Sequence, residues 1–264
     1  MPELPDVEVF KKYMDSTALH QNIEKVHVLD GAILGKVSPR TLQNHLKERE
    51  FTGTERQGKY IFGKTDADEW VVFHFGMTGF FKYYKDDSEQ PGHTRVLIDF
   101  SNGYHLSYDC QRKLGLVDLI DDIQKFIEEK ELGIDAFSDQ MDKDRFFDLI
   151  KNRRGSIKSA LMNQKLISGI GNVYSDEILF HAKFHPAAEI RNLSESDIGR
   201  IYNQMRKVLQ TAIDSQVDPA DMPSSFLLPN RDEDGECPIC DGTIRKSTIS
   251  GRSSYFCEKH QQKN

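Results

Sequence analysis

Residues 167–180 read ISGIGNVYSDEILF, a stretch in which a turn with two glycines, Ser168 to Asn172, leads into an apolar segment with helical spacing. Helical periodicity recurs over four segments: 143–151, 156–164, 172–182 and 194–215. Ser194 followed by Asp197 is a helix start signal. The glycine turn therefore joins two helices, and we expect a helical domain over residues 143–222.

The chain before this helical region has the pattern of a β domain. A helix is expected over residues 6–19, where apolar side chains fall at helical spacing. β-Branched and aromatic residues then gather in short runs between turn residues from about residue 23 to residue 120. The clearest runs are VHVL (26–29), WVVFHF (70–75), RVLIDF (95–100) and LGLVDLI (114–120). Many short strands in succession favour a sandwich or a barrel, so we expect a β domain over residues 1–132.

The chain after the helices has the pattern of a metal-stabilised tail. Residues 216–236 are rich in Pro and acids and are interpreted as a linker. Cys237-Pro-Ile-Cys240 and Cys257-Glu-Lys-His260 are two ligand pairs of the spacing that grips one tetrahedral Zn²⁺. The alternating segment between them is expected to form a hairpin. Four protein ligands close the metal shell, so we predict a zinc finger over residues 230–264 with one structural Zn²⁺.

The overall charge does not point to a nucleic acid. The 264 residues hold 35 Lys and Arg against 42 Asp and Glu, a formal net charge of −7, although basic residues gather at 151–165 and 245–259. Composition therefore neither supports nor excludes DNA as a partner. The cysteine spacing is not that of a secreted disulfide framework, and no apolar run reaches the length of a membrane span. With no signal peptide pattern, a cytoplasmic protein is expected.

The N-terminus, Met1-Pro2-Glu3-Leu4-Pro5, contains a residue that can act as a nucleophile. Removal of Met1 would expose the secondary amine of Pro2. An α-amine has a reference pKa of roughly 7.7–8.0, against about 10.4 for lysine, so more of it is uncharged and nucleophilic at neutral pH. Taken alone, the motif favours the simpler interpretation, in which the prolines only stiffen the chain before a helix.

Several motifs together resemble the formamidopyrimidine-DNA glycosylase and endonuclease VIII family, and its formamidopyrimidine branch in particular. They are MPELPDVE (1–8), GKY (58–60), HFGMTG (74–79), ISGIGNVYSDEILF (167–180), HP (185–186) and the terminal hairpin with GR (251–252). The resemblance implies an α+β fold: an N-terminal helix-capped β-sandwich, a helical helix-two-turns-helix domain and a C-terminal zinc-bound β-hairpin. It also implies a bifunctional glycosylase and abasic-site lyase that removes oxidised purines, such as 8-oxoguanine and formamidopyrimidines, by β,δ-elimination.

The resemblance assigns roles to individual residues. Pro2 is the expected nucleophile and Schiff-base residue, Glu3 acts at the sugar ring oxygen, and Lys59 and Arg252 act at the phosphates beside the lesion. Damaged double-stranded DNA is the expected partner of seven further residues: Met77, His93, Arg112, Leu114, Arg154, Lys158 and Asn172. Met77, Arg112 and Leu114 would fill the gap left by the flipped base. Backbone N–H groups of the glycine turn, at a helix N-terminus, are expected to bind a phosphate.

Three positions depart from the family pattern. The last metal ligand is His260 instead of Cys, position 6 is Asp instead of Glu, and residues 216–236 do not match the loop that covers 8-oxoguanine in this branch. The last departure keeps open the same chemistry on oxidised pyrimidines. A non-catalytic lesion-binding zinc protein and a zinc protein that binds other proteins are further alternatives. The chemistry requires only a monomer and no membrane.

Overall fold

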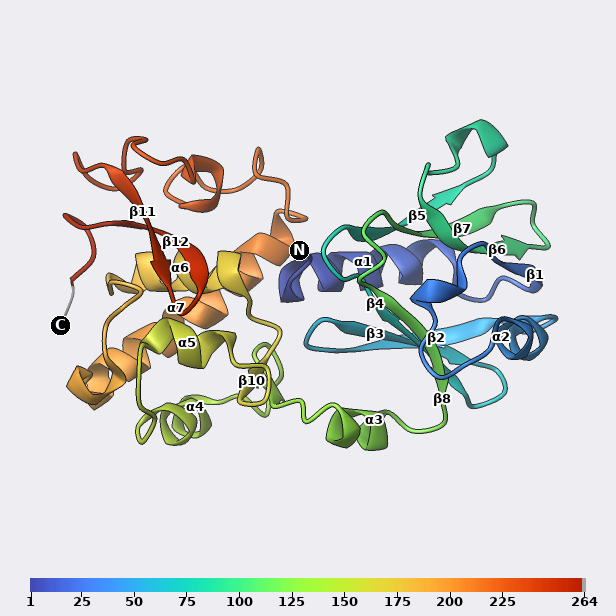
Figure 1. Ribbon diagram of the computed structural model, residues 1–264, viewed down its shortest axis with the longest axis horizontal. Helices are drawn as coiled ribbons and strands as arrows, with labels where there is room; N and C mark the ends of the chain where they lie inside the picture. The colour runs from blue at the N-terminus through green and yellow to red at the C-terminus, as the bar shows by residue number, and fades with distance from the viewer. Residues whose placement is uncertain (263–264) are drawn as a thin grey trace. The chain divides into compact units, whose positions relative to one another are not determined.

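The computed structural model describes residues 1–262. The chain forms two compact units, which we describe one at a time (Figure 1). The first unit holds Met1–Pro2 and Asp6–Lys130, and the second holds Glu3–Pro5 and the chain from Glu131 onward. The tripeptide at positions 3 to 5 therefore packs with a domain that begins more than a hundred residues later in the sequence.

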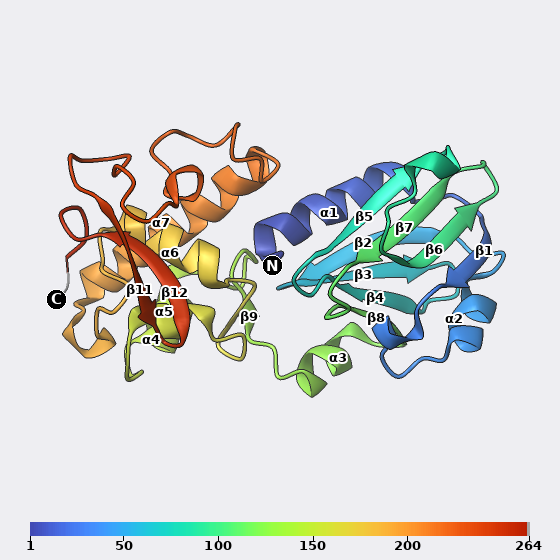
Figure 2. The ribbon, with the colours of Figure 1, turned by 45° about the horizontal axis from the view of Figure 1, so that its top comes forward.

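The first unit contains two four-stranded antiparallel sheets, one of which lies over the other in Figure 2. One sheet has the order β1 (Ile23–Val28), β6 (Thr94–Phe100), β7 (His105–Cys110) and β5 (Gly79–Tyr84). The other has the order β2 (Phe51–Gln57), β3 (Tyr60–Thr65), β4 (Trp70–His74) and β8 (Leu116–Ile120). The predicted β-sandwich is confirmed, and each of the four clearest β runs lies in a strand, β1, β4, β6 and β8.

Alternation along the strands builds the core of the first unit. Ile61 on β3 pairs with Phe73 on β4, and both side chains belong to the main sandwich core. The next residues along the strands, Phe62 and Val72, face the opposite side of the sheet and form a smaller cluster with Phe126. This period of two is the expected consequence of strand geometry.

Helices cover the sandwich. Helix α1 (Leu4–Thr17) begins two residues earlier than expected and adds buried apolar side chains to the core. Two further helices, α2 (Pro39–Leu46) and α3 (Ile123–Glu129), lie in regions without a predicted helix. Their start signals were present in the sequence, because the side chains of Ser38 and Asp122 accept N–H groups at the two N-caps.

The second unit is helical. It contains α4 (Lys143–Ile150), α5 (Ile157–Met162), α6 (Asn172–Ala182) and α7 (Glu195–Asp214), as the sequence predicts. The capping box of Ser194 and Asp197 at the start of α7 is confirmed. Helix α6 is buried from Tyr174 to Phe180, so this helix lies at the centre of the unit. A short parallel pair, β9 (Ile134–Asp135) and β10 (Ile167–Ser168), leads into α6.

The remaining elements are short, apart from the C-terminal hairpin. Four single 3₁₀ turns are η1 (Gly31–Ile33), η2 (Asp87–Glu89), η3 (Ile190–Asn192) and η4 (Leu228–Asn230). The predicted hairpin is confirmed as β11 (Ile244–Ile249) and β12 (Arg252–Cys257), joined by a turn at Ser250 and Gly251 with positive φ. None of the helices in residues 1–262 combines the length and the apolar character needed to cross a membrane.

The segment 216–236 is more than the linker that its composition suggests. Met222 and Phe226 belong to the main core of the second unit, and Leu227 packs with the metal-binding tail. The carboxylate of Glu177 on α6 accepts the backbone N–H groups of Leu227 and Leu228 at 2.8 and 2.7 Å. A few apolar residues spaced among acids and prolines are therefore enough to fix the segment on the helices.

Candidate active site and metal centre

The carboxylate of Glu3 is held at the N-terminus of α6. Its oxygens accept the backbone N–H groups of Gly171, Val173 and Tyr174 at 2.7, 2.9 and 3.2 Å, and the residue is 1 % exposed. Gly171 belongs to the glycine turn whose N–H groups we expected to bind a DNA phosphate. That expectation is wrong for Gly171, because Glu3 already occupies the anion-binding position at the helix N-terminus.

The two glycines of the turn allow this contact. A Cβ atom on Gly171 would overlap the side chain of Glu3, and one on Gly169 would overlap the side chain of Leu4. Gly169 also has φ +108, a conformation that favours glycine. The backbone N–H of Leu4 donates to the carbonyl of Gly169 at 3.0 Å. The turn therefore holds the start of the chain, and with it the residue that follows Pro2.

Lys59 lies in the two-residue turn between β2 and β3. Gly58 has φ +58, and its carbonyl accepts a hydrogen bond from Arg56 Nη1 at 3.1 Å. Arg56 Nε in turn donates to Glu8 Oε2 at 2.7 Å. Lys59 is only 8 % exposed, so it is a fixed cation and not a solvated turn lysine.

Four residues expected to contact DNA lie at one end of the strands of the first unit. Met77 is 40 % exposed in the turn between β4 and β5, and Leu114 is 54 % exposed before β8. Their loops touch, because the backbone N–H of Arg112 donates to Thr78 Oγ1 at 3.1 Å. His93 joins them, since its carbonyl accepts the N–H of Cys110 at the end of β7.

Met77 and Leu114 are thus large apolar side chains exposed in adjacent loops, an arrangement that suits insertion between bases. Gly76 permits the close approach of these loops. Its φ is +58, and a Cβ there would overlap the backbone of Leu114. Most large apolar residues of this unit are buried, and Met77 and Leu114 are two of the few that are exposed.

His74, at the end of β4, is held neutral. Burial lowers its pKa to about 4, and the positive charges of Lys59 and Lys130 act in the same direction. Its Nδ1 accepts the N–H of Gly76 at 3.4 Å, which is consistent with an unprotonated ring nitrogen. The His74 imidazole therefore adds no positive charge to that of the neighbouring Lys59.

Lys158 does not have the position expected for a DNA contact. Its side chain is fully buried, and its Nζ donates to Asp176 Oδ1 and to Ser254 Oγ, both at 2.5 Å. A buried ammonium bound to two acceptors is not available to a phosphate, so the expected direct contact is corrected to an interior ion pair. Burial lowers the pKa of Lys158, whereas its partner Asp176 opposes that shift.

The other three polar residues of the second unit that we expected to contact DNA are less buried than Lys158. Asn172 is the first residue of α6, and its Nδ2 donates to the carbonyl of Ser253 at 2.9 Å, while its Oδ1 is buried without a hydrogen-bond partner. Arg154 is exposed in the loop before α5. Arg252 is exposed at the start of β12, next to the hairpin turn.

Charge pairing sets Arg252 apart from the other basic residues of the tail. Arg245 pairs with Asp234 at 2.6 Å, Lys246 with Glu233 at 3.4 Å and Lys259 with Asp241 at 2.5 Å. Within residues 237–262, Arg252 is the one cation for which the structure shows no ion pair. The acidic run DEDGE at 232–236 thus neutralises part of the tail and leaves the hairpin tip positive.

The three cysteines of the tail form a metal-binding group. The Sγ atoms of Cys237, Cys240 and Cys257 lie within 4.8 Å of one another, and those of Cys240 and Cys257 are 3.7 Å apart. Tetrahedral Zn–S bonds of about 2.3 Å place two sulfurs about 3.8 Å apart, so the spacing fits zinc. Gly242 donates its N–H to Cys240 Sγ at 3.4 Å, and a Cβ there would overlap Cys257 Sγ.

His260 is not part of this cluster of three. Its Nε2 lies 3.0 Å from the carbonyl of Phe180, so the ring is oriented by the end of α6. This is the second hydrogen bond that metal-bound histidines commonly make, and it leaves Nδ1 as the nitrogen for a metal. The structure thus brings together three of the four predicted ligands.

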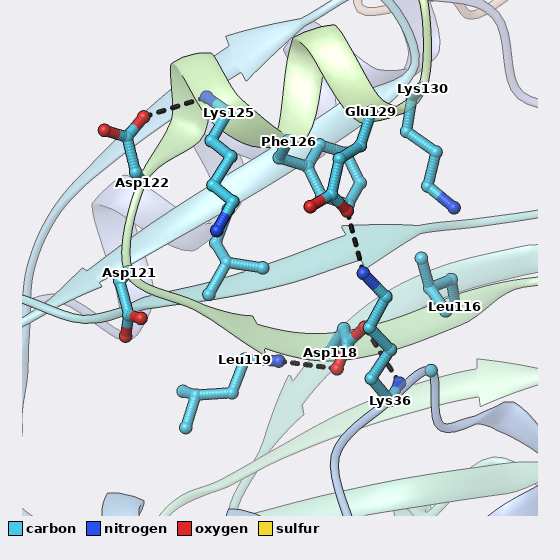
Figure 3. A pocket seen from close by; sticks show the side chains of 12 residues that line it. Lys36, Leu116, Asp118, Leu119, Asp121, Asp122, Lys125, Phe126, Glu129 and Lys130 are labelled. Atoms are coloured by element: carbon cyan, nitrogen blue, oxygen red, sulfur yellow. Dashed lines mark hydrogen bonds and ion pairs between the residues drawn. The ribbon is translucent and has the colours of Figure 1, made fainter.

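A separate hollow of about 220 Å³ lies in the first unit, beside α3 and β8. In Figure 3, Lys36 reaches from its loop to Glu129 on α3, and Asp118 lies beside the Lys36 side chain. Asp118 accepts the backbone N–H groups of Lys36 and Val37, both at 3.0 Å. None of the predicted site residues lines this hollow, so it is separate from the candidate active site.

The sequence did not single out Asp176 or Arg231. Arg231 Nη2 donates to Asp176 Oδ2 at 2.6 Å, and its guanidinium lies 4.7 Å from the ring centroid of Tyr255. The available signal was the pair Asp176-Glu177 inside an otherwise apolar helical segment. Two acids in a buried helix require partners, and here both have them.

These features define a class of protein that combines a β-sandwich, a helical domain with a glycine turn before its central helix, and a three-cysteine hairpin. The N-terminal domain model of formamidopyrimidine-DNA glycosylase matches residues 1–117, and the helix-two-turns-helix (H2TH) domain model of the same enzyme matches residues 132–221. The chain belongs to the formamidopyrimidine-DNA glycosylase family.

Individual relatives match over the full length. Formamidopyrimidine-DNA glycosylase from the Wolbachia of Brugia malayi is 31% identical over 99% of this chain and 100% of its own length. The Synechocystis formamidopyrimidine-DNA glycosylase is 30% identical over 100% of this chain and 99% of its own length. Two crystal structures of the Lactococcus lactis enzyme also match, one with DNA that contains an abasic site and one with DNA that contains FAPY-dG. Each has a TM-score of 0.89 and 26% sequence identity, and the match covers 99% of this chain and 100% of the other.

Proposed function

We infer that this chain is a bifunctional DNA glycosylase and abasic-site lyase of base excision repair that acts on formamidopyrimidines and other oxidised purines in damaged double-stranded DNA. The function rests on family membership over the full length of the chain. The observation that supports the site is the carboxylate of Glu3, which three N–H groups of α6 hold directly beside Pro2 in the sequence.

The first chemical step uses the N-terminal amine. After removal of Met1, the lone pair of the Pro2 nitrogen attacks C1′ of the damaged nucleotide, and the bond from C1′ to the base breaks with its electrons leaving on the base. The attacking nitrogen loses its proton, and its lone pair then expels O4′, so that the C1′–O4′ bond breaks and O4′ takes up a proton. Glu3 is the group proposed to hydrogen-bond or protonate O4′. The product is an iminium ion between Pro2 and C1′.

The iminium ion draws electrons from C2′, so loss of a C2′ proton expels the 3′ phosphate, and a second elimination expels the 5′ phosphate. Lys59 and Arg252 are the cations proposed for these phosphates, because one is fixed in a turn and the other has no ion pair in the described chain. Met77, Arg112 and Leu114 are proposed to fill the space of the flipped base. His93, Arg154 and Asn172 are proposed DNA contacts.

The tail is proposed to hold one structural Zn²⁺. Cys237, Cys240 and Cys257 would be three ligands, and His260 Nδ1 would be the fourth. A closed shell of four protein ligands leaves no position for substrate, so the metal would fold the hairpin that carries Arg252 and take no part in the reaction.

Borohydride trapping tests the proposed function. The zinc-loaded protein with Met1 removed is mixed with duplexes that carry an abasic site, 8-oxoguanine, a formamidopyrimidine or an oxidised pyrimidine. A covalent adduct on the abasic duplex and faster trapping on the purine lesions are expected. Faster trapping on the pyrimidine lesion would assign the other substrate class, and no adduct on the abasic duplex would indicate a non-catalytic lesion-binding protein.

A further inference from the structure

One buried carboxylate connects three distant parts of the second unit. Asp176 lies on α6 with no exposed surface. Its Oδ1 accepts a hydrogen bond from Lys158 of α5, and its Oδ2 accepts hydrogen bonds from Arg231 Nη2 and from the backbone N–H of Tyr255, at 2.6 and 3.1 Å. Since each partner comes from a different segment of the chain, Asp176 ties α5, the 216–236 segment and the C-terminal hairpin to α6.

The hairpin strand β12 is attached to the helices at three consecutive residues. The carbonyl of Ser253 accepts Asn172 Nδ2, the hydroxyl of Ser254 accepts Lys158 Nζ, and the N–H of Tyr255 donates to Asp176. Ser254 has no exposed surface, although its neighbours Arg252 and Ser253 are exposed. The attachment therefore begins immediately after Arg252 and fixes the strand from which the Arg252 side chain projects.

Two of the three attachments depend on Asp176. It receives the Tyr255 N–H directly, and it holds the Lys158 ammonium within reach of Ser254. A buried lysine without a counter-ion is strongly disfavoured, so loss of the Asp176 charge would displace Lys158 as well. Arg231 would also lose its partner, and its Nε is already buried without a hydrogen bond.

We propose that Asp176 is a positioning residue for the reaction, which acts by fixing strand β12 so that Arg252 is directed at the phosphates beside the lesion. The proposal rests on the proposed role of Arg252. It also gives Lys158 a function that its burial allows, because Lys158 carries the effect of Asp176 to Ser254 and touches no DNA. The other hairpin cations, which pair with local acids, need no such support.

The test uses Asp176→Asn, which keeps the shape but places an NH₂ group against one of the three donors. Ser254→Ala removes only the acceptor of Lys158 and serves if the first variant does not fold. Asp234→Asn is the matched control, because it breaks an exposed ion pair on the same hairpin. Each change is made in the zinc-loaded full-length protein, with and without Arg252→Ala.

Two measurements are made: hydrogen exchange of peptides over 252–257 and over the β-sandwich, and affinity for a duplex with a stable abasic-site analogue. Asp176→Asn should speed exchange in 252–257 and not in the sandwich. It should weaken binding about tenfold when Arg252 is present and by much less when it is combined with Arg252→Ala, because the two changes share one effect. Asp234→Asn should change neither.

Unchanged exchange in 252–257 for both Asp176→Asn and Ser254→Ala would overturn the proposal. So would a binding loss of equal size with and without the Arg252→Ala change, since Asp176 would then act independently of Arg252. If Arg252→Ala alone binds as the wild type does, the proposed role of Arg252 fails, and the positioning proposal fails with it even where exchange in 252–257 is altered.

Discussion

Glu3 and Gly171 are in contact although they are far apart in the sequence: the carboxylate of Glu3 lies 2.7 Å from the backbone nitrogen of Gly171, 168 positions further along the chain. The side chain has room because Gly171 carries no Cβ. The residue next to the proposed nucleophile is thereby held by a helix N-terminus, where a negative charge is favoured.

We therefore predict that Gly171→Ala displaces Glu3 and slows base excision. Its φ lies outside the positive region, so the added methyl group acts by overlap with Glu3 and not through backbone strain. A misplacement on the order of 1 Å can cost about a hundredfold in rate. The rate of base excision is measured in single-turnover experiments on a duplex that contains a formamidopyrimidine. Gly53→Ala, where a Cβ meets open space, is the control, and equal rates for the two variants would contradict the prediction.

The lowered proton affinity of His74 gives a prediction about stability. The pKa of His74 is lowered from 6.5 to about 4, so the unfolded chain binds this proton more readily than the folded chain. The contribution of His74 to the free energy of unfolding is greatest above pH 6.5. It declines as the pH falls towards 4, by on the order of 3 kcal/mol in total. Trp70, the single tryptophan, lies on the same strand and reports unfolding by fluorescence.

In the His74→Gln variant, the free energy of unfolding of the β unit should therefore fall less between about pH 7 and about pH 4.5 than it does in the wild type. This is the range in which the unfolded histidine takes up its proton. Urea unfolding followed by Trp70 fluorescence measures this free energy. His20→Gln is the control, because the side chain of His20 is 66% exposed. If His74→Gln and wild type lose the same free energy over this pH range, the histidine is not the source.

Local patterns in the sequence predicted local structure well. The ligand pairs of the tail lie within a few residues of each other, so their spacing alone indicated the metal site, and the three cysteines do converge. The capping box of α7 is equally local.

Contacts between distant residues could not be predicted in this way. Lysines are usually exposed, which favours a DNA contact for Lys158, but its burial depends on Asp176, which comes from the next helix. The glycine turn before α6 has the sequence pattern of a phosphate site. The local sequence does not show that Glu3, 168 positions earlier, already binds these N–H groups. In both cases the missing information is which residue supplies the opposite charge.

Two arginines of the hairpin should differ in their effect on DNA binding. Arg252 has no ion pair in residues 237–262, whereas Arg245 is 2.6 Å from Asp234. Arg252→Ala should weaken binding to abasic-site duplex and reduce the slope of log affinity against log salt by about 1, the value for one phosphate contact. Arg245→Ala should leave the slope unchanged. Identical slopes for the wild type and both variants would remove Arg252 from the interface.

Removal of the metal should separate the tail from the rest of the molecule. The tail contributes only Cys237, Ile244 and Cys257 to a small apolar cluster that it shares with Phe180 and Leu227, whereas the β-sandwich has a large core of its own. Small segments of this kind depend on their metal for folding. Chelation of zinc should therefore speed hydrogen exchange in 237–257 and lower DNA affinity, while the fluorescence of Trp70 stays that of the folded β unit. His260→Ala should weaken zinc retention, and Lys259→Ala, which lies one residue away and pairs with Asp241, should not. Undiminished DNA binding by protein whose metal loss has been verified would show that the hairpin holds its position without the ion.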